Sequence, residues 1–587
     1  MLDVVGTAID DALLVAWRGR VERAGARLGW TVRQAITRRH AGGVLLAITA
    51  PVDLLLLATE VNEWALCASL VERDPLRWSG LEEALVAEAA AAAEDGANPT
   101  AELEPVIEES AAFARFERLG YSEGLPTLRA LIEAAIPHGL RLVLDDVELT
   151  IGTGVGGRSF PLTSLPAVAD VQWAALRDIP TALVTGSNGK TTTVRLLAAC
   201  ARANGWRAGY NCTDGVFIDD DVLATGDYSG PAGARMVLRE ARTQAAIIET
   251  ARGGILRRGI AVSQTDVAVV TNVSSDHFGE YGIDDLEGLA DTKLSVAAVV
   301  APQGMLVLNA DDPQLRARAG GLARRFGRCP PLGWFALDAD HVTLSEYRAR
   351  GASTCGVRNG RLLLSYRGGE HDLGLVSAMP LTIGGIAAYN VANLAGAALG
   401  AAALGIPAAA ISSVFARFGA GPGDNPGRMM CFDVAGARVL LDYAHNPEGL
   451  RGLLSVAVQL RDGDGAGRLC LLLGHAGNRQ DADIEELARV AAQFRPDLVV
   501  VKENDAQLRG RAPGEVPRII RNELKRSGLP ESALPVCDTE VEAARYALDW
   551  ARPHDVLVFP VHSQTARAAV IALLESMRPR DRRADGR

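Results

Sequence analysis

The stretch TALVTGSNGKTTT, residues 181–193, decides the fold of this chain of 587 residues. It begins as a short apolar run, passes through a turn with two glycines and a lysine, and continues into the helical segment VRLLAACARANG. In such a strand–turn–helix context the backbone N–H groups of the turn wrap a phosphate chain at the helix N-terminus. The spacing is the short form GxxGKT, because the longer GxxxxGK[ST] would need glycine where the chain has Val184. The stretch therefore predicts a phosphate-binding loop.

The chemistry of the loop residues indicates how they would bind a nucleotide. Lys190 is placed to reach the β- and γ-phosphates, and the hydroxyl of Thr191 is placed to ligate Mg²⁺. The other residues that we expect to contact the nucleotide are Gly186, Ser187, Asn188, Gly189 and Thr192.

Two blocks of alternating apolar and amphipathic segments predict two α/β domains. The first block has apolar runs at 181–186, 245–250, 266–273 and 305–310, typical of buried parallel strands with helices on both faces of the sheet. We predict a doubly wound central domain over 171–423. Within it, the alternation of apolar and polar residues in VTLSEY and RLLLSY predicts a small antiparallel insert at about 335–385. A second block, with runs at 439–444, 469–474, 498–503 and 556–561, predicts a Rossmann-like C-terminal domain over 424–587.

The N-terminal region, residues 1–170, predicts a mixed α/β domain without catalytic residues. Helical patterning occurs around 82–95 and 125–136, and strand-like runs occur at 44–48 and 140–144. Glycines at 152, 154 and 157 match GxGxxG, but Pro161 follows where a dinucleotide site needs a helix. An arginine-dense stretch suggests that the region holds an acidic substrate, and the alternative is a solvated helix face. Its members are Arg18, Arg20, Arg23, Arg27, Arg33, Arg38 and Arg39.

Composition excludes several functional classes. The net charge of −11 argues against a general nucleic-acid-binding protein. The N-terminus has no basic segment before its apolar residues, so we expect no signal peptide. The apolar stretch 391–415 is dominated by alanine and interrupted by Pro407, which favours two packed helices over a membrane span. None of the eight cysteines has CxxC spacing, which is typical of reduced thiols. We expect a cytoplasmic protein that contacts neither membrane nor nucleic acid.

Polar residues at the ends of predicted strands extend the phosphate site. Glu249 ends the run at 245–250, and Asp276 and His277 follow the next run. Because the carboxyl ends of parallel strands converge on one crevice, we expect Glu249 and His277 to share a site with Lys190 and Thr191.

Several ordered motifs over about 178–570 together resemble the Mur ligases and folylpolyglutamate synthetase. They are TGSNGKTTT, NVSSDH, Lys293 in LADTKLSV, NADD, YNVANLAGAAL, PGR and DYAHNP. The intervening segments TDGVFI, GDYSGPAGARMVLRE, ETARGGILRRG, GHAGNRQDADIEEL and LRGRAPGE resemble the cyanophycin synthetases within that family. The segment LTIGTGVGGRSFPL resembles the end of their N-terminal domain, and on that comparison we expect their ATP-grasp module to be missing here.

The resemblance implies an ATP-dependent, ADP-forming ligase that activates a carboxylate as an acyl phosphate and couples it to an amine. It implies that Glu249 and His277 ligate Mg²⁺, that two such ions are bound, and that Lys293 is carbamoylated and ligates one. Asn390 and Asn393 match the adenine-side asparagines, although Tyr389 stands where the family usually has histidine. Arg428 and Asp442 match an interdomain arginine and a nucleotide-contacting aspartate. Their neighbours His445 and Asn446 have either a role in the site or a structural one.

The resemblance also suggests substrates and leaves two other functions open. An acidic peptide and a basic amino acid are the first expectation, with a homo-oligomeric enzyme. The alternatives are a non-catalytic scaffold or binding subunit and a P-loop NTPase switch. A switch would hydrolyse nucleotide without an amine acceptor, and it leaves the DYAHNP segment unexplained.

Overall fold

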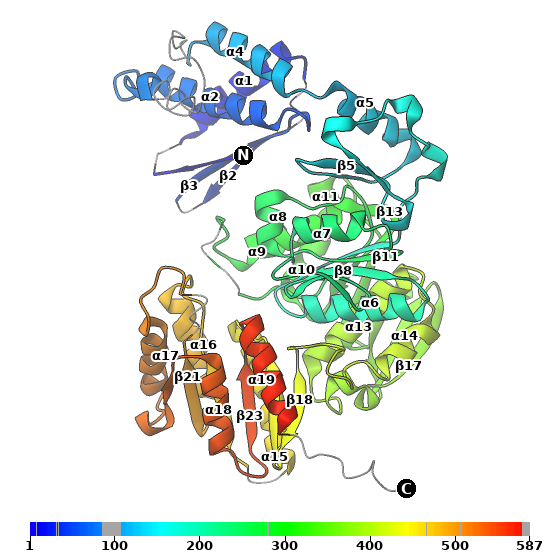
Figure 1. Cartoon of the computed structure of the whole chain (residues 1–587), viewed down its shortest axis with the longest axis vertical. Helices are drawn as coiled ribbons and strands as arrows, with labels where there is room; N and C mark the ends of the chain where they lie inside the picture. Colours follow the sequence, from blue (N-terminus) through cyan, green and yellow to red (C-terminus); the bar gives the residue numbers. More distant parts are fainter. Residues whose placement is uncertain are drawn as a thin grey trace.

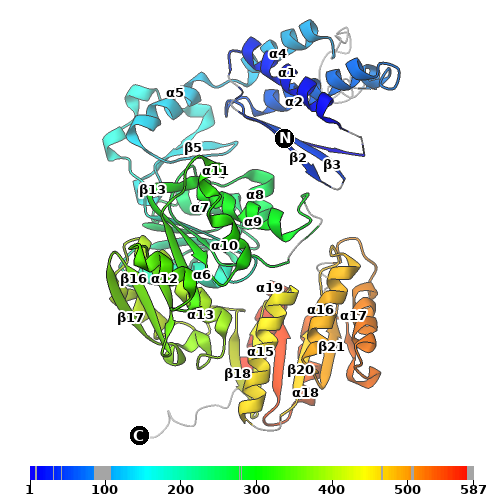
Figure 2. The ribbon, with the colours of Figure 1, turned by 180° about the vertical axis from the view of Figure 1, so that it is seen from behind.

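The computed structural model describes residues 1–6, 9–30, 32, 34–40, 42–84, 107–275, 278, 281–464, 467–503 and 508–577. Figure 1 shows three tiers stacked along the long axis, and Figure 2 shows the same order from behind. We call residues 1–161 the N-terminal tier, residues 181–415 the central tier and residues 430–577 the C-terminal tier. The predicted helix at 82–95 and the chain end at 578–587 lie largely or wholly outside the described residues.

The N-terminal tier holds two small antiparallel sheets. The first has the order β1-β3-β2 and packs against helices α1 and α2, and the second has the order β4-β5-β6. The elements are β1 (Leu2–Val5), α1 (Asp11–Arg27), β2 (Ala35–His40), β3 (Gly43–Ile48), α2 (Leu55–Arg73), α4 (Glu109–Glu123), α5 (Pro126–Ala135), β4 (Leu142–Leu144), β5 (Glu148–Ile151) and β6 (Arg158–Pro161). The GxGxxG glycines include a single 3-10 turn, Gly154–Gly156, and are followed by strand β6 and not by a helix, as the proline predicted.

The central tier is built on one sheet of eleven strands, in the order β10-β9-β8-β11-β7-β12-β13-β14-β15-β16-β17. The seven neighbouring strands β8-β11-β7-β12-β13-β14-β15 run parallel to one another. The hairpin strands at both edges, β9 and β10 on one side and β16 and β17 on the other, pair antiparallel. The strands are β7 (Thr181–Thr185), β8 (Ala208–Cys212), β9 (Gly215–Ile218), β10 (Asp221–Thr225), β11 (Ala245–Glu249), β12 (Thr265–Val270), β13 (Val300–Asn309), β14 (Leu332–Asp338), β15 (Thr354–Arg358), β16 (Arg361–Tyr366) and β17 (Gly369–Leu375).

Helices cover both faces of this sheet, as predicted for a doubly wound fold. In β7, Ala182 and Val184 face one core and Leu183 faces the other, which is the alternation of a strand buried on both sides. The first core lies under α6 (Lys190–Ala203), α13 (Ala388–Ala403) and α14 (Ala408–Phe415). The second lies under α7 (Pro231–Arg239), α8 (Arg252–Arg258), α9 (Leu286–Leu294), α10 (Pro313–Ala319), α11 (Leu322–Phe326) and α12 (Val342–Ala349).

The antiparallel pairing predicted for 335–385 is confirmed for β15, β16 and β17, but the prediction of a separate insert is wrong in two respects. Strands β14 to β17 continue the central sheet instead of forming a separate unit. The segment VTLSEY forms helix α12 and not a strand. Leu344 and Tyr347 lie three residues apart and both pack on the second core, so a helical spacing buries them together. The alanine-rich stretch 391–415 forms the packed helices α13 and α14, as predicted, and no helix in the described part of the chain is long and apolar enough to cross a membrane.

The C-terminal tier is a six-stranded sheet in the order β18-β19-β23-β20-β21-β22, parallel except for the β18–β19 hairpin. Its strands are β18 (Met430–Val434), β19 (Ala437–Asp442), β20 (Leu469–Leu473), β21 (Leu498–Lys502), β22 (Val536–Cys537) and β23 (Val556–Pro560). Helices α15 (Pro447–Asp464), α16 (Asp481–Gln493) and α17 (Glu515–Arg526) cover one face, and α18 (Glu540–Trp550) and α19 (Gln564–Ser576) cover the other. The predicted Rossmann-like pattern is confirmed.

Candidate active site

The predicted phosphate loop connects β7 to the N-terminus of α6 in a backbone shape that requires glycine. Gly186 and Gly189 have φ of 150° and 82°. A Cβ on Gly186 would lie 1.8 Å from the Thr271 hydroxyl oxygen, and one on Gly189 would lie 2.2 Å from Oδ1 of Asn393. The loop is therefore packed between the end of β12 and helix α13, with its N–H groups at the start of a helix.

The polar groups of the loop are held by the neighbouring strand end. The backbone N–H of Asn188 donates to Oδ1 of Asn272 at 2.8 Å, and the Thr271 hydroxyl donates to the carbonyl of Asn188 at 2.6 Å. The Lys190 ammonium lies over the loop and donates to the carbonyls of Gly186 and Ser187, each at 3.0 Å. The predicted lysine is thus at the mouth of the loop.

Thr191 and Glu249 meet beneath the loop, as the position of Glu249 at the end of a strand next to the loop predicts. The Thr191 hydroxyl donates to Oε2 of Glu249 at 2.8 Å, and the Thr213 hydroxyl donates to Oε1 at 3.3 Å. Glu249 is fully buried. Burial raises the pKa of its carboxyl above the ordinary value, although Lys190 and the Thr191 hydroxyl act against that shift. A buried carboxylate beside a hydroxyl is an oxygen donor set that suits a hard divalent cation.

Lys293 lies at the same site as Lys190 and Glu249, whereas His277 lies outside the described residues. Lys293 is 2% exposed on α9 and lines a cavity of about 650 Å³ together with Lys190 and Glu249. Asp276 and His277 lie outside the described residues. Within the described residues no cluster of three or more His, Cys, Asp or Glu side chains has the geometry of a metal site.

A second cavity, of about 850 Å³, lies between the central and C-terminal tiers and holds the predicted nucleotide residues. Its wall includes the loop residues 187–192, Asn390, Asn393, Arg428 and Asp442. Asn393 donates to Oδ1 of Asn390 at 3.1 Å, and Asn390 donates to the carbonyl of Leu381 at 3.0 Å. These contacts fix the two amides on the cavity wall.

Tyr389, which stands where the resemblance led us to expect histidine, also lines this cavity. Its hydroxyl is shielded from solvent and has no hydrogen-bond partner among the described residues. The Tyr389 ring packs against the region of Gly452 on α15, where a Cβ would lie 3.1 Å from it. The aromatic ring therefore takes part in the docking of the C-terminal tier.

The C-terminal tier and the connection that precedes it contribute charged groups across the cavity. The guanidinium of Arg428 lies over the Tyr443 ring, 4.0 Å from its centroid. Asp442 accepts a hydrogen bond from the backbone N–H of Met429 at 2.7 Å, and burial raises the pKa of its carboxyl. Asn446 donates to Oδ1 of Asn188 at 2.9 Å. The DYAHNP segment therefore contacts the phosphate loop directly.

Several residues that the sequence did not single out line the 650 Å³ cavity. They are Asp227, Arg252, Arg257, Arg258, Tyr281, His475, Arg479, Arg509 and His562. Arg252 and Arg257 lie 5.9 Å and 5.6 Å from the centroid of the Tyr281 ring. Most of these residues fall in or beside segments such as GDYSGPAGARM, ETARGGILRRG and GHAGNRQ, so the segments were found but the individual residues were not.

His562 is one of these residues, and its protonation state is set by its surroundings. Burial lowers the pKa of its imidazole, and the ammonium of Lys502 acts in the same direction. The neutral ring donates through Nε2 to the carbonyl of Ala444 at 3.0 Å, since a carbonyl only accepts. His562 therefore supports the DYAHNP turn.

The arginine-dense stretch of the N-terminal tier is mostly engaged in local contacts. Arg20, Arg23, Arg27 and Arg39 pair with Glu72, Glu109, Glu117 and Asp11 of the same tier, and Arg18 donates to the carbonyl of Ala35. Arg33 lies outside the described residues. Arg38 is different, because it donates to the carbonyl of Gly282 in the central tier, next to Tyr281. These contacts favour a structural role for most of the stretch.

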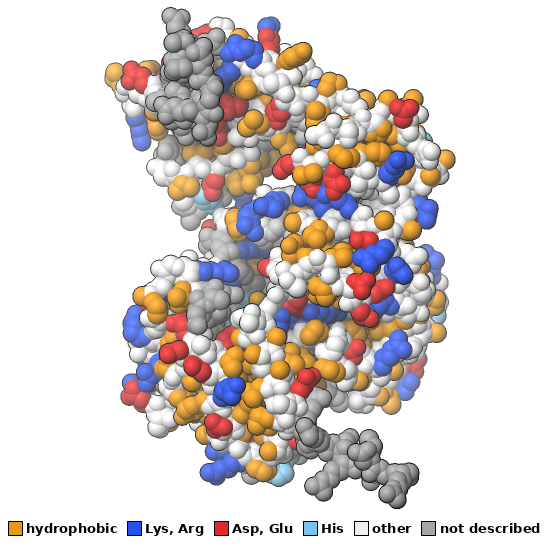
Figure 3. All heavy atoms as spheres, viewed as in Figure 1, with side chains coloured by type: hydrophobic (Ala, Val, Ile, Leu, Met, Phe, Trp, Pro, Cys, Tyr) orange, Lys and Arg blue, Asp and Glu red, His pale blue; other side chains and the backbone are white. Residues whose placement is uncertain are grey.

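Arginine and lysine side chains gather where the first two tiers meet. Figure 3 shows this face hollowed between the N-terminal and central tiers, with Lys and Arg side chains (blue) over α7 and α8. The three arginines of α8 that line the 650 Å³ cavity are Arg252, Arg257 and Arg258. This side of the molecule presents a basic surface next to the cavity.

Comparison with known proteins identifies relatives of the central and C-terminal tiers. The model of the Mur ligase middle domain matches residues 184–336, and that of the Mur ligase glutamate ligase domain matches 427–560. The UDP-N-acetylmuramoyl-L-alanyl-D-glutamate--2,6-diaminopimelate ligase of Alkalilimnicola ehrlichii is 30% identical over 383 residues, which cover 64% of this chain and 70% of that protein.

Cyanophycin synthetases are also similar to this chain. The protein from Synechocystis sp. is 36% identical over 404 residues, which cover 68% of this chain and 44% of that protein. The chain thus matches less than half the length of these relatives. Among solved structures, Escherichia coli FolC in complex with ADP has a TM-score of 0.49 and 18% identity, with coverage of 68% of this chain and 89% of that one.

Proposed function

The chain belongs to the Mur ligase family, and from this premise we propose that it is an ATP-dependent ligase that joins a carboxylate to an amino-acid amine. The observation that carries the proposal is the Thr191–Glu249 hydrogen bond of 2.8 Å directly beneath a glycine loop that no larger residue fits. It supports a site that holds a triphosphate and a divalent cation together.

The residues on the cavity walls suggest how the reaction is divided between the tiers. A substrate carboxylate accepts the terminal phosphoryl group of ATP, and an amine then attacks the acyl phosphate and releases inorganic phosphate. Lys190 offsets the negative charge that develops during phosphoryl transfer. Arg428, in the connection between the tiers, and Asp442, in the C-terminal tier, line the cavity opposite the loop. Closure of that tier over the loop would keep water from the acyl phosphate.

The donor set beneath the loop fits magnesium. Thr191 and Glu249 would hold one ion, which supplies positive charge close to the phosphates. A second ion would use His277 and a carbamoylated Lys293. A carbamate is an anion, whereas the ammonium of an unmodified lysine would be repelled by the ion. The buried position of Lys293 on the cavity wall supports this proposal.

The charges of the 650 Å³ cavity support an acidic peptide as the carboxylate substrate. Arginine is suited to carboxylates because its planar fork binds them in bidentate fashion. Arg252, Arg257, Arg258, Arg479 and Arg509 all line this cavity. Asp227 lies on the same wall and offers a carboxylate to a cationic amino acid. An acidic peptide and a basic amino acid are therefore the first pair to test.

The experiment is a screen of phosphate release over amino acids crossed with acidic peptides, with the amide product identified by mass spectrometry. A ligase releases phosphate only when both substrates are present. Phosphate release that no amine increases would indicate an NTPase switch instead. Nucleotide binding without turnover under every substrate pair would indicate a binding subunit.

A further inference from the structure

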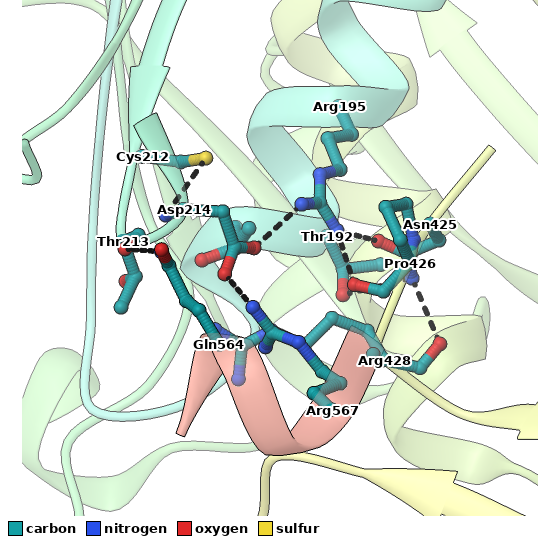
Figure 4. A network of polar contacts seen from close by, with 12 residues as sticks. Thr192, Arg195, Cys212, Thr213, Asp214, Asn425, Pro426, Arg428, Gln564 and Arg567 are labelled. Carbon is teal, nitrogen blue, oxygen red and sulfur yellow. Dashed lines mark hydrogen bonds and ion pairs between the residues drawn. The ribbon is translucent and has the colours of Figure 1, made fainter. Parts of the chain in front are cut away.

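One buried carboxylate joins two arginines that lie far apart in the sequence. Asp214, in the turn between β8 and β9, accepts a hydrogen bond from Arg195 Nη2 at 2.6 Å. Its other oxygen pairs with Arg567 Nη2. Arg195 belongs to α6, the helix of the phosphate loop, and Arg567 belongs to α19 of the C-terminal tier. Figure 4 shows the carboxylate between the two guanidinium groups.

This arrangement is shielded from solvent. The side chains of Arg195, Asp214 and Arg567 are only 5%, 10% and 8% exposed. Burial raises the pKa of the Asp214 carboxyl, but Arg428, Arg195 and Arg567 outweigh it and hold that pKa below its ordinary range. The carboxylate is therefore charged at neutral pH, and salt screens such a buried pair much less than a surface pair.

Arg195 also holds the segment that carries Arg428. Its Nη1 donates to Oδ1 of Asn425 at 3.1 Å and to the carbonyl of Pro426 at 3.0 Å. The amide of Asn425 in turn donates to the carbonyl of Arg428 at 3.2 Å. The connection between the central and C-terminal tiers is thus tied to the phosphate-loop helix at the same residue that binds Asp214.

The residue before Asp214 links the same two parts of the molecule. The hydroxyl of Thr213 donates to the carboxylate of Glu249, and its carbonyl accepts a hydrogen bond from Gln564 Nε2 of α19 at 3.2 Å. Thr213 and Asp214 therefore contact both the buried carboxylate of the site and the first turns of α19.

We propose that Asp214 is a positioning residue that docks the C-terminal tier on the phosphate-loop helix, and thereby places Arg428 and Asp442 across from the loop. The kinetic part of this inference rests on the proposed function, whereas the docking itself does not. Because the nucleotide cavity is lined by both tiers, loss of docking lowers the population that binds nucleotide well, and the apparent affinity falls by that fraction.

The alternative is that Asp214 only stabilises the fold. A second ion pair on the same helix provides the control that separates the two roles. Arg202 of the same helix pairs with Asp220 at 2.7 Å, and Asp220 is 96% exposed. This second pair ties α6 to the β9–β10 turn within the central tier alone. Asp220→Asn is therefore the control for Asp214→Asn.

Docking is measured directly as a distance between the tiers. Spin labels are placed at the exposed positions Val222 on β10 and Tyr546 on α18, as Val222→Cys and Tyr546→Cys in the full chain. The exposed thiols Cys329 and Cys431 are first replaced by serine. Pulsed electron spectroscopy then reports the distance distribution with and without the ATP analogue AMP-PNP and Mg²⁺.

Two variants release the contact at different points. Asp214→Asn removes the shared charge and leaves both arginines unpaired, so it carries a risk of misfolding. Arg567→Gln removes only the partner from the C-terminal tier and leaves the Arg195–Asp214 pair intact. Asp214→Glu keeps the charge and is the conservative rescue.

We expect Arg567→Gln, and Asp214→Asn if it folds, to broaden the distance distribution and to weaken AMP-PNP binding about tenfold. Asp220→Asn should change neither quantity, and Asp214→Glu should restore most of the docking. Calorimetry with AMP-PNP and Mg²⁺ measures this affinity without any amide product, so the result stands even if the ligase reaction is not found. Unchanged distances in Arg567→Gln, or broadened distances with unchanged nucleotide affinity, overturn the proposal.

Discussion

The hydroxyl of Thr191 and the carboxylate of Glu249, 58 residues apart in the chain, are joined by a hydrogen bond of 2.8 Å. Thr191 is in the first turn of α6, and Glu249 is the last residue of β11, the strand next to β7. A parallel sheet brings these two positions together because its strands all end at the same edge.

Lys190→Ala should abolish ATP-dependent ligation, with a loss of about 10³-fold or more, because the ammonium stabilises charge that develops on the phosphates. The thermal unfolding midpoint should change little, since within the described part of the chain the hydrogen bonds of the Lys190 ammonium go to carbonyls of its own loop. Lys525→Ala is the matched control, because Lys525 pairs with Glu531 on the surface of the C-terminal tier. A variant at Lys190 that keeps full activity would remove this lysine from the mechanism.

Glu249→Gln should lose magnesium-dependent activity yet unfold at a higher temperature than the parent in EDTA at neutral pH. Burial raises the pKa of the Glu249 carboxyl, so the metal-free folded state binds its proton more tightly than the unfolded state does. The stability of the parent therefore falls as pH rises from the ordinary glutamate value through the raised one. Glutamine does not titrate and escapes this loss.

The measurement for Glu249 is a series of thermal unfolding curves in EDTA between about pH 5 and pH 8. The difference between variant and parent should grow with pH to a few degrees. Mg²⁺ should remove much of the difference, because it stabilises the ionised carboxylate of the parent only. A difference that is constant across this pH range would contradict the assignment.

Lys293→Ala should lose activity, and added acetate or bicarbonate should restore part of it by supplying an anion in the vacated volume. The expectation follows from the burial of Lys293 on the wall of the cavity that also contains Lys190 and Glu249. Intact-mass measurement under native conditions should show the added carbamate on the parent protein. An experimental density map with an unmodified amine at this position would count against carbamoylation.

Arg38→Met should raise the KM for the acidic acceptor several-fold and leave the KM for ATP unchanged. Arg38 donates to the carbonyl of Gly282, and its neighbour Tyr281 lines the arginine-rich cavity with a left-handed backbone, φ 56°. Loss of the contact should relax this turn and weaken uniform substrate binding. Arg39→Met is the control, since Arg39 contacts only Asp11 and Ile9 of its own tier among the described residues. Equal effects of the two variants would leave the N-terminal tier without a role in acceptor binding.

Most inner parallel strands of the central and C-terminal sheets could be predicted from the sequence because they are buried on both faces. Such strands appear as continuous apolar runs, and the runs at 181–186 and 469–474 correspond to β7 and β20. The same approach was wrong at α12, where the alternation of Val342 and Leu344 with polar residues fits a strand, but the three-residue spacing of Leu344 and Tyr347 fits a helix. Short amphipathic segments are ambiguous because packing against neighbours, and not local pattern, decides between them.

The sequence by itself determined the phosphate loop, the strand-end position of Glu249 and the motif residues Asn393, Arg428 and Asp442. The loop and the strand end depend on local backbone shape and on sheet topology, which leave a pattern along the chain, whereas Asn393, Arg428 and Asp442 were found through the resemblance to a known family. Only the tertiary structure decided that Asp214 binds Arg195 and Arg567 at once, and that Arg38, alone among the described arginines of its stretch, reaches the central tier. A charged side chain finds its partner through the fold, because any of 71 acidic residues could pair with it on charge alone. Proximity and burial in the folded protein decide which residue it pairs with, and neither can be read from the order of the residues in the sequence.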